Sequence, residues 1–184
     1  LNKVCHSFHL SLQSGCDETL KRMNRKYTTS EFSKITNILR KYYKDVILTT
    51  DIIVGFPGET EEEFKETYDF LEKIKFYKMH IFPYSPRRGT IAAKMPNQIS
   101  GDIKSKRSKT LIELSDKNQK DYNERLLEKN VEVLFEEPKN GYIKGHTSNF
   151  ILVKCKTNQN FENQIKSVKI IGAEIEDVIG EVNS

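Results

Sequence analysis

The sequence has 184 residues and a formal net charge of +4, from 30 basic and 26 acidic side chains. Hydrophobic residues make up 36% of it, and it holds only 9 Gly and 5 Pro, which excludes collagen-like and wholly disordered chains. We find no signal peptide and no apolar run of the roughly 18 residues that a membrane span needs. The three cysteines are widely spaced and indicate a reducing compartment, so we expect a cytoplasmic protein with no membrane attachment.

The first hundred residues alternate between strand-like and helix-like segments. Strands are predicted over residues 6–12, 46–54 and 79–82, and the β-branched second segment is typical of a strand buried on both faces. Helical patterns separate the three. This order predicts βαβ units with a parallel sheet, and therefore an α/β fold.

Capping boxes mark the starts of the two helices between these strands. In each box a threonine precedes a glutamate by three residues, Thr28 with Glu31 and Thr60 with Glu63, so that side chain and backbone can bond reciprocally. The first helix is predicted to bury one apolar face. That face consists of Phe32, Ile35, Ile38, Leu39 and Tyr42.

The pattern changes after residue 100. One long polar helix is predicted over residues 102–127, with a solvated basic face. Five short period-two segments follow, with a turn at Asn140-Gly141, and they predict a small five-stranded β-barrel. We therefore place two domains at residues 1–127 and 128–184. The basic face comprises Lys104, Lys106, Arg107 and Lys109.

Polar residues follow each of the three predicted strands. They are Gln13 and Ser14 after the first, residues 55–59 after the second, and residues 83–85 after the third. Ligands of parallel α/β folds bind at this edge, where loops and helix N-termini converge. The alternative is that Gln13 only satisfies loop amides.

Three stretches resemble the second half of a radical S-adenosylmethionine (SAM) core of the methylthiotransferase family. They are HLSLQSGCDETLKRMNRKYT (residues 9–28), TTDIIVGFPGETEEEF (49–64) and YSPRRGTIAAKMPNQI (84–99). The closing segment resembles the family's TRAM domain, a small OB-like RNA-binding barrel. The resemblance therefore implies the C-terminal half of a partial (βα)6 barrel followed by that domain. Within the family, the first stretch is most similar to enzymes that act on threonylcarbamoyladenosine beside the tRNA anticodon.

The cluster motif of the family is absent from this sequence. C-x3-C-x2-C does not occur, and Cys5, Cys16 and Cys155 cannot supply three converging thiolates. The resemblance implies SAM and two 4Fe–4S clusters in a full-length enzyme, with neither cluster ligated here. We therefore interpret the chain as an inactive C-terminal fragment that supplies no catalytic residue of its own.

The resemblance carries cofactor contacts onto matching positions only. Gln13 and Ser14 fall where the family contacts the SAM ribose and methionine, and Arg25, with Arg22 and Lys26 as competitors, could meet the SAM carboxylate.

Ile53 and Gly55 match the adenine-side motif of the superfamily, and the resemblance implies that adenine packs there. Asp51 is a candidate beside them, although it stands where the motif has its first glycine. Tyr84 either closes over SAM or only ends the third strand.

The histidines and the aromatic and basic residues of the barrel are two further candidate groups. The four histidines show no metal-binding spacing, so His9 and His80 are predicted to line or pack the core, and no metal ligand is assigned. In the barrel, Tyr142 with Lys144 and Lys154 is the predicted RNA surface, because aromatic and cationic side chains bind single strands. Phe150 is predicted to pack in the core.

The predicted function is tRNA methylthiotransfer to carbon 2 of the modified adenosine. The alternatives are a non-catalytic RNA-binding module and a ribosomal-protein methylthiotransferase. The predicted partner is tRNA. Because half a barrel leaves a strand edge unpaired, we also expect self-association through that edge.

Overall fold

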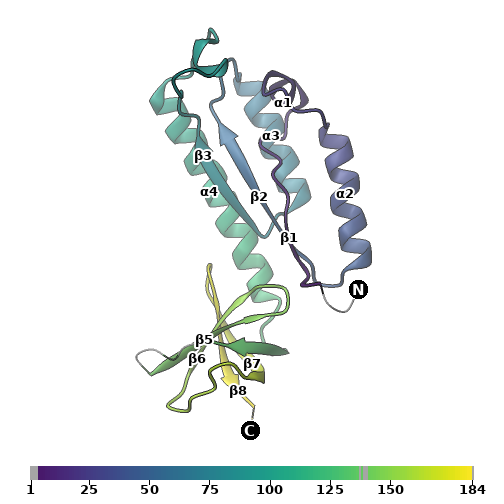
Figure 1. Cartoon of the computed structure of the whole chain (residues 1–184), viewed down its shortest axis with the longest axis vertical. Coiled ribbons are helices and arrows are strands. Elements are labelled where there is room, and N and C mark those ends of the chain that lie inside the picture. The colour runs from purple at the N-terminus through teal and green to yellow at the C-terminus, as the bar shows by residue number, and fades with distance from the viewer. Residues whose placement is uncertain (1–3, 137, 139–140, 184) are drawn as a thin grey trace. The chain divides into compact units, whose positions relative to one another are not determined.

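The computed structural model describes residues 4–136, 138 and 141–183. Three strands, β1 (Ser7–His9), β2 (Ile47–Val54) and β3 (Lys78–Pro83), form one sheet in the order β1-β2-β3 (Figure 1). β2 and β3 run parallel, and the register places Asp51 opposite His80. The predicted parallel sheet and α/β class are confirmed. The helices are α1 (Asp17–Arg22), α2 (Thr29–Tyr42), α3 (Glu61–Ile74), the 3-10 helix η1 (Ala92–Lys94) and α4 (Gly101–Glu124).

β1 is shorter than the predicted strand over residues 6–12. Beyond His9 the chain still bonds to β2, through Leu10 N–H to the Thr49 carbonyl and Gln13 N–H to the Asp51 carbonyl, both at 2.9 Å. Gln13 then adopts a φ of 75°, which takes the backbone out of the extended region. The segment therefore ends as an isolated parallel bridge between Gln13 and Ile52. The short helix α1 follows and was not predicted.

β2 buries one face and leaves the other half-buried, so the expectation of burial on both faces is wrong. Leu48, Ile52 and Val54 are buried, whereas Asp51 and Ile53 on the opposite face are only half-buried. The physical reason is visible in Figure 1, where α2, α3 and the first part of α4 all lie on one side of the sheet.

Helix α2 begins as predicted but turns a different face inward. Glu31 N–H donates to Thr28 Oγ1 at 3.2 Å, and Thr28 N–H donates to the Glu31 carboxylate at 2.8 Å. Phe32 is buried and packs edge-on to Phe76, with ring centroids 6.1 Å apart. Three residues of the predicted apolar face are instead exposed, because that stripe points away from the sheet. They are Ile35, Ile38 and Tyr42.

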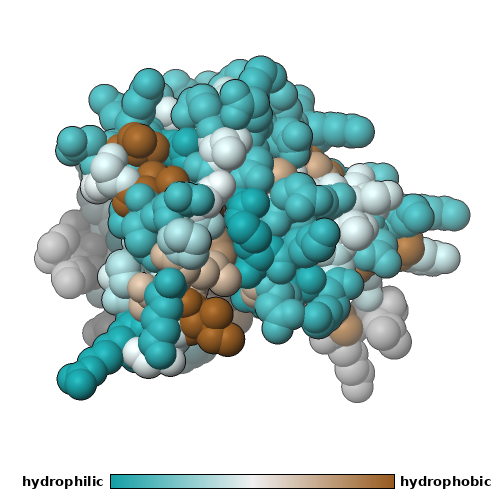
Figure 2. All heavy atoms as spheres, turned by 90° about the horizontal axis from the view of Figure 1, so that it is seen from above, coloured by the Kyte–Doolittle hydropathy of each residue, from teal (hydrophilic) through white to brown (hydrophobic). Residues whose placement is uncertain are grey.

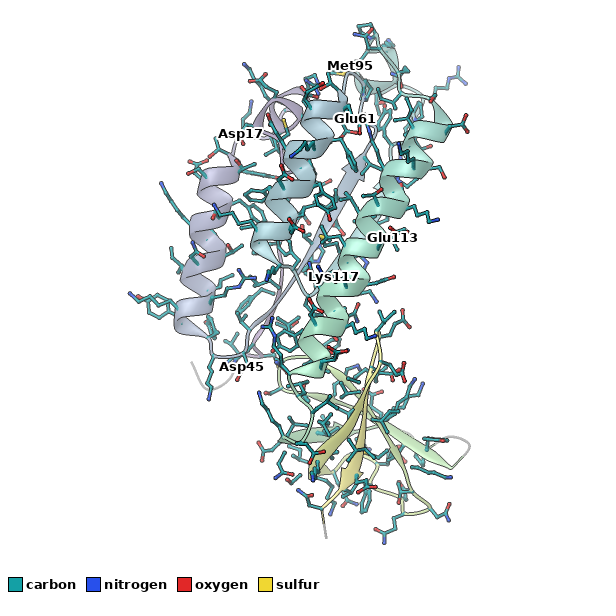
Figure 3. All side chains as sticks on the ribbon, turned by 180° about the vertical axis from the view of Figure 1, so that it is seen from behind. Asp17, Asp45, Glu61, Met95, Glu113 and Lys117 are labelled. Carbon is teal, nitrogen blue, oxygen red and sulfur yellow. The ribbon has the colours of Figure 1, made fainter. Side chains whose placement is uncertain are left out.

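Helix α3 begins with the second predicted capping box. Thr60 Oγ1 accepts from Glu63 N–H at 3.2 Å, and the Glu63 carboxylate accepts from Thr60 N–H at 3.1 Å. Figure 3 shows acidic side chains at the starts of α1 and α3, Asp17 and Glu61, where they complement the helix dipole. Asp17 also accepts from Thr29 N–H at 2.7 Å, which joins α1 to the start of α2.

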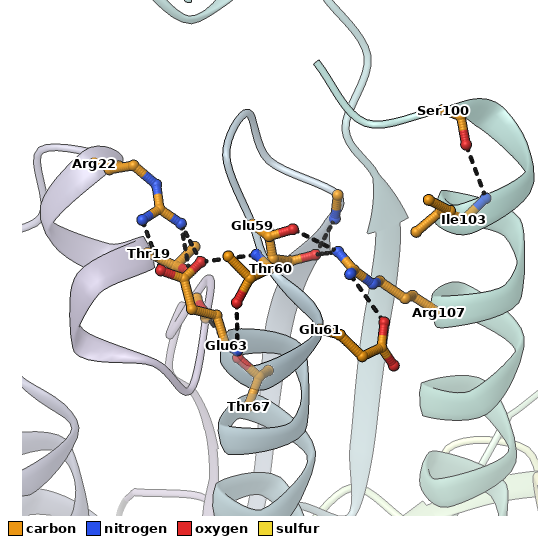
Figure 4. A network of polar contacts seen from close by, with 12 residues as sticks. Thr19, Arg22, Glu59, Thr60, Glu61, Glu63, Thr67, Ser100, Ile103 and Arg107 are labelled. Atoms are coloured by element: carbon orange, nitrogen blue, oxygen red, sulfur yellow. Dashed lines mark hydrogen bonds and ion pairs between the residues drawn. The ribbon is translucent and has the colours of Figure 1, made fainter. Parts of the chain in front are cut away.

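Arg107 on α4 is buried, and its predicted place on a solvated basic face is wrong. Its guanidinium donates to the Glu59 carboxylate at 2.7 Å, to the Glu59 carbonyl at 3.1 Å and to the Glu61 carboxylate at 3.1 Å (Figure 4). The same Glu59 oxygen accepts from Gly55 N–H at 2.7 Å. The first part of α4 is thus fixed to the loop that follows β2.

The C-terminal strands close into the predicted five-stranded barrel, in the order β4-β5-β6-β8-β7. Gly145 and Gly180 allow close packing there, since a Cβ at either would lie 2.3 Å from a neighbouring heavy atom. Asn140 of the predicted turn lies outside the described residues. The strands are β4 (Asn130–Phe135), β5 (Tyr142–Thr147), β6 (Leu152–Lys156), β7 (Ile165–Ala173) and β8 (Val178–Val182).

The chain divides into two compact units. One holds residues 9–42 and 48–115, and the other holds the residues up to Phe8, residues 43–47 and residues 116–184. Hydrophilic side chains dominate the surface seen in Figure 2, in keeping with a mean hydropathy of −0.62. Among the described residues, no helix combines the length and the apolar character that crossing a membrane requires.

We predict that Arg107→Met lowers the free energy of unfolding of the α/β unit by about 3 kcal/mol, because it leaves the buried Glu59 carboxylate without its cation. The double variant Glu59→Gln with Arg107→Met should recover part of the loss, since the neutral amide still accepts from Gly55 N–H. Urea denaturation followed by circular dichroism measures the change, and hydrogen exchange of β2 amides localises it.

The matched control is Lys106→Met, which removes an exposed cation from the same helix and should change stability by less than about 0.5 kcal/mol. An Arg107→Met variant as stable as this control would contradict the prediction.

Candidate functional site

A cavity of about 530 Å³ lies at the carboxyl ends of β2 and β3, within the α/β unit. It brings together four residues that the sequence analysis assigned to cofactor binding, Gln13, Asp51, Ile53 and Tyr84. This is the edge where parallel sheets bind their ligands. The remaining lining residues are Phe82, Pro83, Ser85, Arg87, Thr90 and Ala92.

Gln13 is held in a strained backbone conformation at this cavity. Its N–H donates to the Asp51 carbonyl and its carbonyl accepts from Ile53 N–H, each at 2.9 Å, while its φ is 75°. Non-glycine residues in the left-handed region carry a conformational cost and cluster at functional sites. Both backbone groups of Gln13 are thus occupied by β2, so its amide side chain is not needed to satisfy them.

Tyr84 presents a buried hydroxyl without a hydrogen-bond partner among the described residues. Its N–H donates to the Val54 carbonyl at 2.9 Å, and its ring packs edge-on to Phe56, with centroids 5.2 Å apart. Buried hydroxyls are usually paired, so an unpaired one in a cavity wall is suited to a ligand. The sequence analysis expected Tyr84 to close over SAM, and its placement in the lining keeps that prediction open.

Gly55 supports the cavity from outside it. Its φ is 68°, and a Cβ there would lie 2.1 Å from Cγ of Lys104, which packs across this glycine. Lys104 in turn donates to the Tyr84 carbonyl at 3.0 Å. Gly55 is not among the residues that line the cavity. Its role in the structure is to form the turn after β2 and to let the Lys104 side chain pack against the backbone.

Ser14 and Arg25 are placed away from the cavity lining. Ser14 is fully buried, its hydroxyl within 3.2 Å of Thr67 Oγ1 and accepting from Cys16 N–H at 3.2 Å, which is a role in packing α1. Arg25 is exposed. The guanidinium that lines the cavity belongs to Arg87, and the only sequence signal for it was its position in the loop after the third strand.

Arg22, the competitor of Arg25, is bound within the fold (Figure 4). Its guanidinium donates to both oxygens of Glu63, with the Nη1 to Oε1 distance at 2.8 Å, and Nη2 also donates to Thr19 at 3.1 Å. This pairing holds the pKa of Glu63 below its usual value. Arg22 therefore joins α1 to α3 and is not available to a ligand.

The cysteines do not fit an iron–sulfur cluster. Cys5 is exposed, whereas Cys16 and Cys155 are buried in different compact units. Burial raises the pKa of Cys155 to about 11 and, together with the nearby Glu66, raises the pKa of Cys16. Cluster ligation needs three converging thiolates, and burial of Cys16 and Cys155 disfavours their thiolate forms, so no step is assigned to a cluster on this chain.

The predicted RNA surface of the barrel is only partly open. Tyr142 is 44% exposed and Lys144 is exposed, but Lys154 is paired with the buried carboxylate of Asp177. Phe150 is 65% exposed and stacks on His146, with ring centroids 4.6 Å apart, so its predicted core packing is wrong. The cause is its backbone, which has a φ of 71° in the turn before β6 and points the ring outward.

Comparison with known proteins places the chain. Residues 1–71 match the model of the radical SAM superfamily. The chain is 40% identical over 178 residues to threonylcarbamoyladenosine tRNA methylthiotransferase MtaB of Bacillus subtilis, a match that covers 94% of this chain. It is 38% identical over 184 residues to tRNA-2-methylthio-N(6)-dimethylallyladenosine synthase of Caldicellulosiruptor saccharolyticus, covering 99% of this chain.

Over nearly its whole length the chain is similar to members of the radical SAM methylthiotransferase family. It spans 39% of the length of both relatives. A third relative, the dimethylallyladenosine synthase of Thermoanaerobacter sp. (strain X514), is 43% identical over 159 residues, which cover 86% of this chain and 33% of the relative. Members of this family use SAM and 4Fe–4S clusters. Of these groups, the cavity residues fit SAM, since they offer an orphan hydroxyl, an amide, a carboxylate and apolar walls.

The strain at Gln13 generates a prediction about stability. Gln13→Gly should be more stable than Gln13→Ala by about 1 kcal/mol, because glycine alone adopts a φ near 75° without cost. Urea denaturation of the two variants measures the difference. At Ser11, which lies two residues earlier with an ordinary φ, the same pair should show the opposite order. Equal stability of Gly and Ala at position 13 would show that the backbone there is unstrained.

Proposed function

We propose that this chain is the SAM-binding and RNA-binding part of a tRNA methylthiotransferase that modifies carbon 2 of an adenosine beside the anticodon. The observation that carries the proposal is the cavity at the strand ends, with the orphan hydroxyl of Tyr84 beside Gln13 and Asp51. The reaction class comes from the similarity to tRNA methylthiotransferases. The cluster would be ligated by chain outside these 184 residues, because the three cysteines present do not fit one.

In this proposal different cavity residues bind the adenine, the ribose and the methionine carboxylate of SAM. Ile53 and Phe82 offer apolar surface to the adenine. The Asp51 carboxylate accepts from the ribose hydroxyls, and the Gln13 amide can accept from them or donate to them. Arg87 can pair with the methionine carboxylate. When bound, SAM would supply the methyl group and, on one-electron reduction by the cluster ligated outside these residues, the radical that removes hydrogen from the substrate. The side chains of this chain orient the cofactor and keep its polar groups paired.

The threonylcarbamoyl-modified adenosine is the substrate that we favour. The relative from B. subtilis carries that name, whereas the relatives from Caldicellulosiruptor and Thermoanaerobacter are named for the dimethylallyl-modified nucleoside. The segment QSGCDETLKRMNRKYT, which contains α1, supports the first assignment through its resemblance to that subgroup.

The barrel is proposed to be a TRAM domain that contacts tRNA through Tyr142 and Lys144. The support is the closed five-stranded architecture together with an exposed aromatic ring and a cation on the same strand, β5. Self-association through the edge of the sheet is part of the proposal as well, since β1 is an edge strand. The exposed stripe of Ile35, Ile38 and Tyr42 on α2 adds apolar surface that a second copy could cover.

The test of the function is methylthiolation by the enzyme that contains this chain. The enzyme is reconstituted without oxygen and supplied with SAM, a reductant, sulfide and tRNA whose adenosine is unmodified at carbon 2. Mass spectrometry of the digested tRNA should reveal the methylthio nucleoside. Tyr84→Phe should weaken SAM binding about tenfold through the loss of one buried hydrogen bond, as measured by calorimetry. Tyr42→Phe, on the exposed face of α2, is the matched control and should bind SAM normally.

Binding of tRNA without any product would favour the RNA-binding module instead. A methylthiolated ribosomal protein, with no modified tRNA, would favour a ribosomal-protein methylthiotransferase.

The two barrel lysines should differ in their effect on tRNA binding. Lys144→Ala should lower the affinity and reduce the steepness of its salt dependence by about one ion, because a phosphate contact releases a counterion. Lys154→Ala should leave the salt dependence unchanged, since Lys154 is neutralised by Asp177. Binding is measured by filter retention at several salt concentrations. An effect of Lys154→Ala as large as that of Lys144→Ala would contradict the assignment.

A further inference from the structure

Two histidines and an aspartate from three adjacent strands converge on the half-buried face of the sheet. His9 belongs to β1, Asp51 to β2 and His80 to β3, and one ligand atom from each lies within 4.8 Å of the other two. The parallel register places Asp51 directly opposite His80. Their wide separation in sequence explains why no local spacing pattern indicated a metal site.

The chemistry of this set is that of a divalent transition-metal centre. Two imidazoles and one carboxylate bind Zn²⁺ and Fe²⁺ well and leave coordination positions open for other ligands. His9 Nε2 lies 3.1 Å from Asp51 Oδ2. Two ligand atoms that are each about 2.1 Å from one ion, at angles between octahedral and tetrahedral, are about 3.0 to 3.4 Å apart. The observed pair already has this separation, and the exposed His80 places its ligand atom within 4.8 Å of both.

The residues around His9 support the same role. Thr49 Oγ1 lies 3.0 Å from His9 Nδ1, so the second ring nitrogen is occupied and Nε2 is the one turned to Asp51. Ser11 donates to Asp51 Oδ2 at 3.2 Å. Metal-bound histidines regularly have a second hydrogen bond of this kind, which fixes the ring and its tautomer. The strands supply a rigid frame for all three ligands.

We propose that His9, Asp51 and His80 form a binding site for one divalent transition-metal ion, with Zn²⁺ as the probe. Asp51 also lines the cavity described above, so an ion and a ligand in the cavity would share this side chain. The proposal concerns a second property of this face and does not depend on methylthiotransfer.

The test is a titration of the 184-residue chain, freed of metal by a chelator, with Zn²⁺ by calorimetry and with Co²⁺ by optical absorption. We expect one equivalent to bind, with the visible Co²⁺ bands of a low-symmetry nitrogen and oxygen site. His80→Gln and Asp51→Asn should each weaken binding at least tenfold. His146→Gln is the matched control. His146 also lies beside a carboxylate, 2.7 Å from Glu136, but among the described residues it belongs to no group of three ligand side chains.

Circular dichroism and urea denaturation of each variant separate a lost ligand from a lost fold. Histidine NMR gives an independent measurement, since Zn²⁺ should shift the ring signals of His9 and His80 and leave those of His6 and His146 in place. The proposal is overturned if His80→Gln binds Zn²⁺ as tightly as the unchanged chain, or if Co²⁺ shows the intense sulfur charge-transfer bands of a cysteine site. Neither result would bear on SAM binding or on tRNA, which are measured separately.

Discussion

The buried ion pair between Arg107 and Glu59 is the interaction on which the candidate site depends. Both side chains are almost fully buried, and Glu59 accepts from Gly55 N–H as well as from Arg107. Burial raises the pKa of Glu59, although the Gly55 and Arg107 hydrogen bonds oppose that shift. A buried carboxylate is costly unless every oxygen is paired, so this pair constrains both the turn after β2 and the helix that supplies Arg107.

The constraint passes from the turn to the cavity wall. Gly55 must keep its positive φ, and the stem of Lys104 fills the space that a side chain at this glycine would occupy. Lys104 then donates to the Tyr84 carbonyl, which fixes the backbone of the residue that carries the orphan hydroxyl. One side of the cavity is therefore held by α4 through two basic residues, Lys104 and Arg107. The sequence pattern indicated only a solvated basic face for both.

Local rules predicted what local interactions determine. Both capping boxes form, the sheet is parallel and the barrel has five strands, because these features follow from side-chain spacing within one element or between neighbours in the chain. The cavity contains four residues that the sequence analysis named. Gln13 and Tyr84 follow strands that meet at one edge, whereas Asp51 and Ile53 lie within β2 and were named through the family resemblance. The resemblance to a family contributed the identity of the ligand.

The predictions that were wrong concern residues whose partners lie far away in the chain. Arginine and lysine are ordinary surface residues. Only the fold reveals that Arg107 pairs with the buried carboxylate of Glu59 and that Lys154 pairs with that of Asp177. The inward face of α2 was misjudged for the same reason. Its apolar stripe is genuine, but the position of the sheet and not the pattern decides which residues are covered, so Thr36 is buried while Ile35 is exposed. The convergence of His9, Asp51 and His80 likewise needs the strand register.

The half-buried face of the sheet sets a limit on what can bind there. It presents the ring nitrogens of His9, the hydroxyl of Thr49 and the carboxylate of Asp51, which bond to one another at 3.0 to 3.1 Å. Covering such groups with an apolar layer would cost free energy unless each kept a hydrogen bond. The opposite face, with Leu48, Ile52 and Val54, is apolar and is covered by helices. The hydrogen bonds among these groups would persist under any layer, but the charge of the Asp51 carboxylate would still be desolvated. The polar face therefore favours an occupant with polar atoms or charge, as in a nucleoside cofactor, a metal ion or a modified base, over a hydrophobic helix.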